Sequence, residues 1–191
     1  MPEAEFWLTC GSTYTYLALS RLDAVERASG VRFTVRPFNL GVIFAERNYF
    51  PFPPDAPKTR YMWRDIERRA KARGLPVSLP VPYPAPQPNV RRANEAAHFA
   101  LRHDWGRAYL LASYRAWFGS GLGPGTPENM RRALAEAGQD ADAVLAAIEA
   151  ENLGGALDAA TERAKALGIF GAPTFVVDGE LFWGDDRLED A

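Results

Sequence analysis

The stretch FGAPTFVVDGELFWG, from Phe170 to Gly184, contains two short apolar runs with Asp178-Gly179 between them. An Asp-Gly pair in this setting is typical of the two-residue turn of a β-hairpin. The stretch therefore predicts a strand, a tight turn and a second strand. Residues 154–169, which come directly before it, have the pattern of a helix. The C-terminal part of the chain is thus expected to run helix, strand, strand.

The N-terminal part is expected to run strand, helix, strand. Residues 5–8 are expected to form a short buried strand, and residues 13–29 place apolar side chains at helical spacing up to Gly30. Residues 31–40 then alternate apolar and polar side chains, as a half-buried strand does. Two strands joined through a helix in one sheet are parallel. Together with the C-terminal part, this order predicts an α/β fold with one mixed sheet.

The middle of the chain, residues 41–153, has a different character and is predicted to be helical. It begins with the proline-rich loop NYFPFPPDAP and continues with a basic helix over residues 58–74. The proline-broken stretch 75–90 is expected to be extended, without a regular element. Two further helices are expected, over residues 91–118 and 127–152.

This order divides the chain into two predicted domains. Residues 1–40 and 154–191 are expected to form one discontinuous domain around the sheet, and residues 41–153 an inserted helical domain. Within the insertion, Thr126 is a suitable N-cap for the second long helix, and Pro127 fits its first position.

The composition is that of an ordinary globular protein, with 47% hydrophobic and 24% charged residues in a chain of 191. A formal net charge of −2 offers no basic surface for nucleic acid. The apolar runs are shorter than the roughly 20 residues that cross a membrane. The first residues lack the pattern of a signal peptide. We therefore expect a cytoplasmic protein without a nucleic-acid or membrane partner.

Cysteine and histidine are too few for several kinds of site. Cys10 is the single cysteine, which excludes an internal disulfide and a Cys-x-x-Cys redox pair. His98 and His103 lack the i,i+4 spacing of a helical metal pair. No metal site is predicted.

Five segments, taken in order, carry a family resemblance. They are SxxxYLA from Ser12 to Ala18, KTRYMWRDIERRA, GLPVSLP, GAPTFVVDG and FWGDDRL. In this order they resemble the 2-hydroxychromene-2-carboxylate isomerases and kappa-class glutathione transferases, which are DsbA-like members of the thioredoxin superfamily. The resemblance covers nearly the whole chain. It implies a thioredoxin-like fold with a helical insertion, in which Pro173 is cis and faces the active site.

The resemblance implies that Ser12 is catalytic. It matches the serine that activates the thiol of bound glutathione, although Thr13 replaces the family's usual proline. The nucleophile is a thiolate, and the partial positive charge of a helix N-terminus favours an anion. A serine hydroxyl there can also donate a hydrogen bond to the sulfur. The nucleophilic sulfur would then belong to glutathione and not to Cys10.

The resemblance also implies a set of glutathione ligands. Lys58 matches the lysine that holds the glycine end, and Asp65 an aspartate that can reach the ligand of the partner subunit. Asn48 lies close to a family asparagine that contacts glutathione. Ala172, before the cis-proline, would offer backbone groups to the cysteinyl part. The pair Asp185-Asp186 matches residues that bind the γ-glutamyl end.

Each of these residues also has a purely local interpretation. Ser12 could serve only as the N-cap of the first helix. Lys58 and Asp65 could be charges on a solvated helix face, and Pro173 an ordinary loop proline. The Asp185-Asp186 pair could simply cap a last helix.

Cys10 and the aromatic residues of the middle helices have alternatives as well. Cys10 is interpreted as a buried thiol at a strand end, and its alternative is a reactive thiol at the helix N-terminus. Five aromatic residues are interpreted as helix packing more than as substrate contacts: Trp63, Trp105, Tyr109, Tyr114 and Trp117.

The function expected from the resemblance is glutathione-dependent isomerisation of an unsaturated aromatic acid by a homodimer. Arg60, Arg64 and Arg91 are candidates to bind the substrate carboxylate. The alternatives are a kappa-type transferase that conjugates electrophiles, and a non-catalytic or monothiol DsbA-like protein. Relatives continue beyond the position of Ala191, so the last helix is expected to be missing here or very short.

Overall fold

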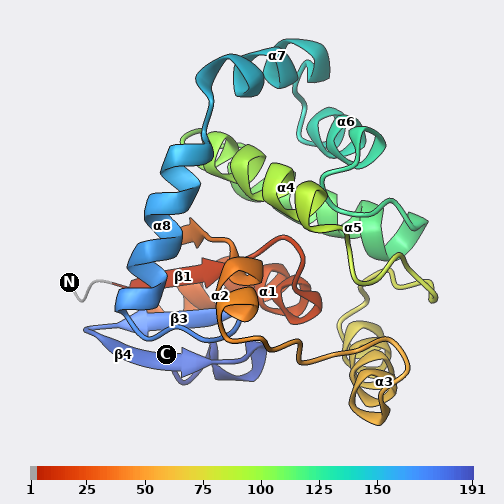
Figure 1. The fold of residues 1–191 in the computed structure, drawn as a ribbon, viewed down its shortest axis with the longest axis vertical. Helices are drawn as coiled ribbons and strands as arrows, with labels where there is room; N and C mark the ends of the chain where they lie inside the picture. Colours follow the sequence, from red (N-terminus) through yellow and green to blue (C-terminus); the bar gives the residue numbers. More distant parts are fainter. Residues whose placement is uncertain (1–3) are drawn as a thin grey trace.

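The structure is a computed structural model that describes residues 4–191 (Figure 1). Four strands form one mixed sheet in the order β2-β1-β3-β4. Their bounds are β1, Ala4–Leu8; β2, Phe33–Pro37; β3, Thr174–Val177; and β4, Glu180–Trp183. β1 is parallel to β2 and antiparallel to β3, and β3 is antiparallel to β4. This is the mixed sheet predicted from the two ends of the chain.

The helices and the turn that were predicted at the two ends of the chain are confirmed. Helix α1, Thr13–Ser29, joins β1 to β2 and ends at Gly30, whose φ of 76° is left-handed. Helix α8, Gly154–Ala166, precedes β3. The turn between β3 and β4 is Asp178-Gly179, and both residues have the positive φ that a type I′ turn requires.

The side chains of β1 belong alternately to two cores. Phe6 and Leu8 belong to a large cluster that includes Tyr16 of α1. Trp7, between them, belongs to a smaller cluster with residues of α8 and of helix α2, Leu40–Glu46. Because successive side chains of a strand point to opposite faces, α1 covers one face of the sheet, and α2 and α8 cover the other. In Figure 1, α8 crosses in front of the sheet and α1 lies behind it.

The helical middle contains two breaks that were not predicted. Its helices are α3, Pro57–Ala72; α4, Gln87–Ala100; α5, Gly106–Ser120; α6, Pro127–Glu136; and α7, Ala141–Glu151. The single helices expected over residues 91–118 and 127–152 are therefore wrong, because each is two helices. A Cβ on Gly106 would lie 2.3 Å from a main-chain oxygen at the end of α4, so α5 begins tightly beside that end. The second break follows from Gly138, which is left-handed, and from Asp140, which caps α7.

Some of the other local predictions are confirmed and others are not. Thr126 caps α6 by accepting a hydrogen bond from the N–H of Asn129, as predicted. Of the stretch 75–90, residues 75–86 contain no helix or strand, as predicted, but residues 87–90 belong to α4, so the prediction is wrong there. Helix α2 was not predicted, because it is short and has no side-chain cap. The last helix, which was expected to be missing or very short, is a short 3₁₀ turn, η1, Asp185–Arg187.

The inserted helices pack against the sheet in the larger of the two buried clusters. The cluster that contains Phe6 of β1 also contains Ala93 of α4 and Trp117 of α5. Figure 1 places α4 to α7 above the sheet and α3 to one side of it. None of the helices within residues 4–191 has both the length and the apolar character needed to cross a membrane.

Candidate active site

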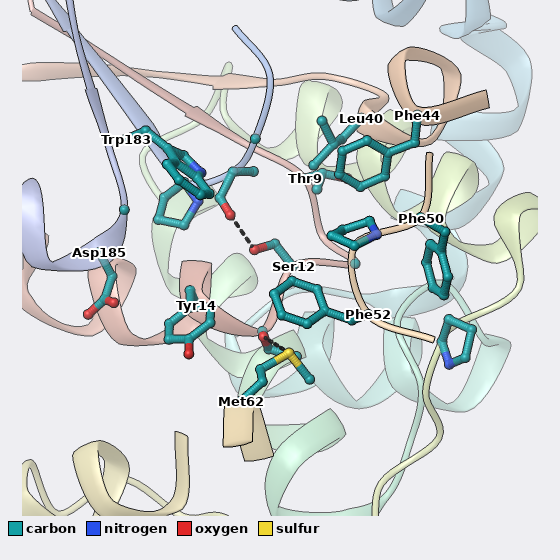
Figure 2. A pocket seen from close by; sticks show the side chains of 18 of the residues that line it. Thr9, Ser12, Tyr14, Leu40, Phe44, Phe50, Phe52, Met62, Trp183 and Asp185 are labelled. Carbon is teal, nitrogen blue, oxygen red and sulfur yellow. Dashed lines mark hydrogen bonds between the residues drawn. The ribbon is translucent and has the colours of Figure 1, made fainter. Parts of the chain in front are cut away.

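A cavity of about 680 Å³ lies where the inserted segment meets the start of α1. Its lining comes from the β1–α1 loop, α1, α2, the segment before α3, α3 itself, the start of α4, the segment before β3, and the end of β4 with η1. Ser12 lies near the middle of this hollow in the close view of Figure 2. Segments far apart in the sequence therefore meet around one serine.

Ser12 stands at the N-terminus of α1 but does not cap it. Its backbone occupies the N-cap position, yet α1 has no side-chain cap hydrogen bond. Instead, Ser12 Oγ donates a hydrogen bond to the carbonyl oxygen of Ala172 at 2.8 Å (Figure 2). The first N–H groups of an α-helix have no partner within the helix. The hydroxyl and the helix end thus border the same cavity, and the Ser12 hydroxyl does not make the cap hydrogen bond that the local interpretation expects.

The loop that receives the Ser12 hydrogen bond contains the expected cis-proline. The peptide bond between Ala172 and Pro173 is cis, and both residues line the cavity. A Cβ on Gly171 would lie 2.3 Å from the indole nitrogen of Trp183, so the glycine lets that ring lie against the loop. Trp183 also packs edge-on against Phe170, with ring centroids 4.9 Å apart.

Asn94 of α4 holds the loop that carries Ser12, and no sequence motif singled it out. It is fully buried. Its Oδ1 accepts a hydrogen bond from the N–H of Cys10 at 2.8 Å, and its Nδ2 donates to Thr9 Oγ1 and to the Phe38 carbonyl, both at 3.1 Å. These bonds tie α4 to the segments that follow β1 and β2. A lone asparagine in a helix gives no local signal for this role, because its partners are distant in sequence.

One end of the cavity is a network of charged side chains. Asp185, which is only 1% exposed, accepts hydrogen bonds from Arg69 Nη2 at 2.6 Å and from Arg21 Nη1 at 3.3 Å. Asp65 Oδ2 lies 3.6 Å from Arg69 Nη1 and accepts a hydrogen bond from the Tyr14 hydroxyl at 3.2 Å. Burial raises the pKa of Asp185, and the two guanidinium groups oppose that rise. Burial, together with Asp65, also raises the pKa of Tyr14.

The other predicted ligand residues meet the cavity in different ways. Asp186 lines it and is exposed, with Oδ2 3.1 Å from Arg187 Nη2. Partial burial raises the pKa of Asp186, but the hydrogen bond from Arg187 outweighs this and the pKa lies below its usual value. Lys58 lines the cavity, with Nζ 5.0 Å from the centroid of the Phe52 ring. Asn48 is not among the lining residues and lies exposed just after α2, with a φ of 45°.

The opposite end of the cavity is apolar. Figure 2 places Leu40, Phe44, Phe50 and Phe52 on the side of Ser12 away from Asp185. Further apolar or aromatic lining residues near the insertion are Tyr49, Tyr83, Pro84 and Val90. A flat, apolar group is therefore the natural occupant of this end.

The arginines proposed for a substrate carboxylate lie elsewhere. Arg60, Arg64 and Arg91 do not line the cavity. Arg91 is paired with Glu95 and Asp158, at 3.0 Å and 2.8 Å. The cations that do line the cavity are Lys58, Arg69 and Arg187.

The five aromatic residues interpreted as packing also lie outside the lining, and three of them are fully or almost fully buried: Tyr109, Tyr114 and Trp117. Trp63 and Trp105 are partly buried and pack against the large cluster. Within residues 4–191, no group of three or more histidine, cysteine, aspartate or glutamate side chains is placed to hold a metal ion.

Cys10 is a buried thiol and not a reactive one. It is 4% exposed, and its Sγ lies 3.6 Å from the Ala93 carbonyl oxygen. Burial raises the pKa of the thiol to about 12. The thiol is therefore neutral at neutral pH, which argues against a monothiol oxidoreductase that uses Cys10.

We expect Cys10 to react with an aromatic disulfide reagent about a thousandfold more slowly in the native protein than in denaturant, at about pH 8. The reason is the thiolate fraction, which falls by that factor when the pKa rises from the free value to about 12. The native rate should keep rising with pH towards pH 12, whereas the denatured rate levels off above about pH 8.5. Equal rates in the two states would contradict this account of Cys10.

The comparisons with known proteins agree with the fold. The family model for the DSBA-like thioredoxin domain matches residues 4–191. The chain therefore belongs to the DsbA-like thioredoxin family, and it has the α/β, thioredoxin-like fold with helical additions that the resemblance implied.

Within that family the chain falls with the 2-hydroxychromene-2-carboxylate isomerases, and it is an enzyme of this isomerase-like class. A relative of that name from Sphingobium xenophagum is 30% identical, over 97% of this chain and 93% of its own length. Another, from Pseudomonas putida, is 26% identical, over 96% of this chain and 89% of its own.

Solved structures also support the thioredoxin-like fold. A structure described as 2-hydroxychromene-2-carboxylate isomerase aligns with a TM-score of 0.78 at 23% identity, over 97% of this chain and 90% of that one. A second neighbour is the cytosolic disulfide reductase DsbM from Pseudomonas aeruginosa, solved with GSH. It aligns with a TM-score of 0.65 at 18% identity, over 98% of this chain and 92% of that one.

Proposed function

We propose that this enzyme is a glutathione-dependent cis–trans isomerase of an unsaturated aromatic acid of the 2-hydroxychromene-2-carboxylate type. The thiolate of glutathione adds to the conjugated double bond, the bond rotates as a single bond, and the thiolate leaves again. The C–S bond that forms is also the one that breaks, so glutathione is regenerated. The observation that carries the proposal is the Ser12 hydroxyl, which lies in the cavity at an uncapped helix N-terminus.

The free energies involved favour a role for both the helix and the hydroxyl. A free thiol has a pKa near 8.5, and lowering it by two units requires about 2.7 kcal/mol. A helix N-terminus contributes roughly 0.3–2 kcal/mol to binding an anion. A hydrogen bond to a charged group contributes about 1.5–3 kcal/mol. The helix alone falls short of the required value, whereas the helix and the Ser12 hydrogen bond together, at about 2–5 kcal/mol, can supply it.

The lining offers complementary groups for each part of glutathione. The ammonium of Lys58 suits the glycine carboxylate, and the carboxylate of Asp186 suits the γ-glutamyl ammonium. The main chain at Ala172 suits the cysteinyl amide. The Ala172 carbonyl can accept from that amide N–H, and it keeps a hydrogen-bond partner when the Ser12 hydroxyl turns from it to donate to the sulfur. For Asn48, which does not line the cavity, the role in glutathione binding stays a prediction without further support.

The apolar end of the cavity supports an aromatic substrate. With the sulfur at Ser12, the ring of the acid would extend towards Leu40, Phe44 and Phe52. The proposal keeps the homodimer implied by the family resemblance and the cytoplasmic location predicted from the sequence.

The proposal is tested by following 2-hydroxychromene-2-carboxylate with and without glutathione while the free thiol is counted. We expect turnover only when glutathione is present, with all of the thiol recovered at equilibrium. Loss of one thiol for each product molecule would instead identify a kappa-type transferase. Turnover without glutathione, or no turnover with it, would contradict the proposed cofactor.

A further inference from the structure

Arg69 lines the polar end of the cavity and has spare hydrogen-bonding capacity. Its Nη2 donates to Asp185 at 2.6 Å, while its Nη1 lies 3.6 Å from Asp65, outside hydrogen-bond distance. The side chain is 24% exposed. A guanidinium carries five N–H donors in a rigid fork, so Arg69 can accept a further anionic partner from the cavity without leaving Asp185.

Asp185 is unsuited to bind a ligand cation directly. Its side chain is 1% exposed, and it already lies between the guanidinium groups of Arg69 and Arg21. Arg21 also donates to the main-chain oxygen of Asp185 at 2.7 Å. A second cation would have to displace one of two arginines from a buried carboxylate, which is costly. Asp185 therefore fixes the position of Arg69, and Arg69 is the side chain of this pair that can contact a ligand in the cavity.

We propose that Arg69 binds the α-carboxylate of the γ-glutamyl end of glutathione and so selects a thiol with a free amino-acid end. This inference rests on the proposed function, because it names the ligand of the same site. Asp186, which lines the cavity beside Arg69 and is exposed, takes the ammonium of that end. The ammonium and the carboxylate of the γ-glutamyl end thus contact one exposed carboxylate and one fixed cation, with Asp185 acting as the positioning residue for the cation.

The other lining cations fit this role less well. Arg187 is 49% exposed, and its two terminal nitrogens are already bonded to Asp186 and Asp190, at 3.1 Å and 2.7 Å. The Nζ of Lys58 lies 5.0 Å from the centroid of the Phe52 ring, and Figure 2 shows Phe52 on the apolar side of Ser12. Arg69 alone among the three is held by a buried carboxylate, and a preorganised guanidinium loses less freedom when it binds.

The test is a cycle of one protein change and one ligand change, measured as dissociation constants by calorimetry. The ligands are glutathione and 4-aminobutyryl-cysteinylglycine, which lacks only the α-carboxylate. We expect wild type to bind glutathione at least about 10-fold more tightly than the analogue, as a charge-assisted pair predicts. Arg69→Gln should bind the two ligands equally, with the loss confined to glutathione.

Three further variants make the result specific. Arg69→Lys keeps the charge beside Asp185, so it tests the inference even if Arg69→Gln fails to fold, and it should keep only part of the preference. Arg68→Gln is the matched control, because Arg68 is the neighbouring arginine, contacts Asp65 at 3.5 Å and does not line the cavity. It should keep the full preference, and so should Arg187→Gln.

The outcomes separate this inference from the proposed function. If wild type binds glutathione but Arg69→Gln weakens both ligands equally, the inference fails and the proposed cofactor stands. The same holds if the preference disappears in Arg187→Gln and survives in Arg69→Gln. If wild type does not bind glutathione at all, both fail together.

Discussion

Replacing Ser12 by alanine is expected to lower the isomerase turnover by about 10- to 100-fold, because the variant loses one hydrogen bond to a charged sulfur. The fold should persist, because the Ser12 hydroxyl makes one hydrogen bond, to the Ala172 carbonyl, and does not cap α1. The helix N-terminus remains in the variant, so part of the acceleration should remain as well. The measurement is the turnover number at saturating glutathione and substrate, with the melting temperature recorded alongside.

Ser20→Ala is the matched control for this change. Ser20 lies on the same helix, and its hydroxyl donates to the Leu17 carbonyl at 2.9 Å, outside the cavity. The control removes the same kind of hydrogen bond and should leave turnover unchanged. If both variants turn over like the wild type, a catalytic hydroxyl at Ser12 is excluded.

Asn94→Ala is expected to destabilise the protein by about 3–5 kcal/mol. The substitution leaves three groups at the ends of β1 and β2 without their partner: the Cys10 N–H, Thr9 Oγ1 and the Phe38 carbonyl. Each buried polar group left unpaired costs about 1–3 kcal/mol, and contributions from one network do not add fully. The free energy of unfolding, from denaturant titration monitored by tryptophan fluorescence, measures the effect.

The comparison for this prediction is Asn89→Ala. Asn89 is in the first turn of the same helix, is only partly buried, and makes no side-chain hydrogen bond within residues 4–191. It should cost less than about 0.5 kcal/mol, as is usual for surface substitutions. A loss below about 1 kcal/mol in Asn94→Ala would mean that the β1–α1 loop is held by other contacts.

The sheet could be predicted from the sequence because its signals are local. The Asp178-Gly179 turn, the helix end at Gly30 and the alternation in β2 each act over a few residues. The breaks inside the middle helices could not be predicted in the same way. The end of α4 and the start of α5 depend on how closely Gly106 approaches the preceding turn, which is a tertiary contact.

The residues of the candidate site show the same difference between local and long-range signals. The motifs located Ser12, Lys58, Asp65, the Ala172-Pro173 pair and the Asp185-Asp186 pair, and all of them line one cavity. Asn94 lies in no motif, and Arg69 lies in the KTRYMWRDIERRA segment but was given no role there, because their principal partners lie 84 and 116 residues away. In our proposal, the pairing with Arg69 makes Asp185 a buried support for that arginine instead of a direct ligand.

The thiol pKa of glutathione bound to the wild-type enzyme tests the central claim most directly. It is read from the thiolate absorbance of the saturated complex between about pH 5 and about pH 9. A bound pKa about two units below the free value, with most of that shift lost in Ser12→Ala, is the result that this account predicts. A bound thiol that titrates near its free pKa of about 8.5, in wild type and variant alike, would contradict it.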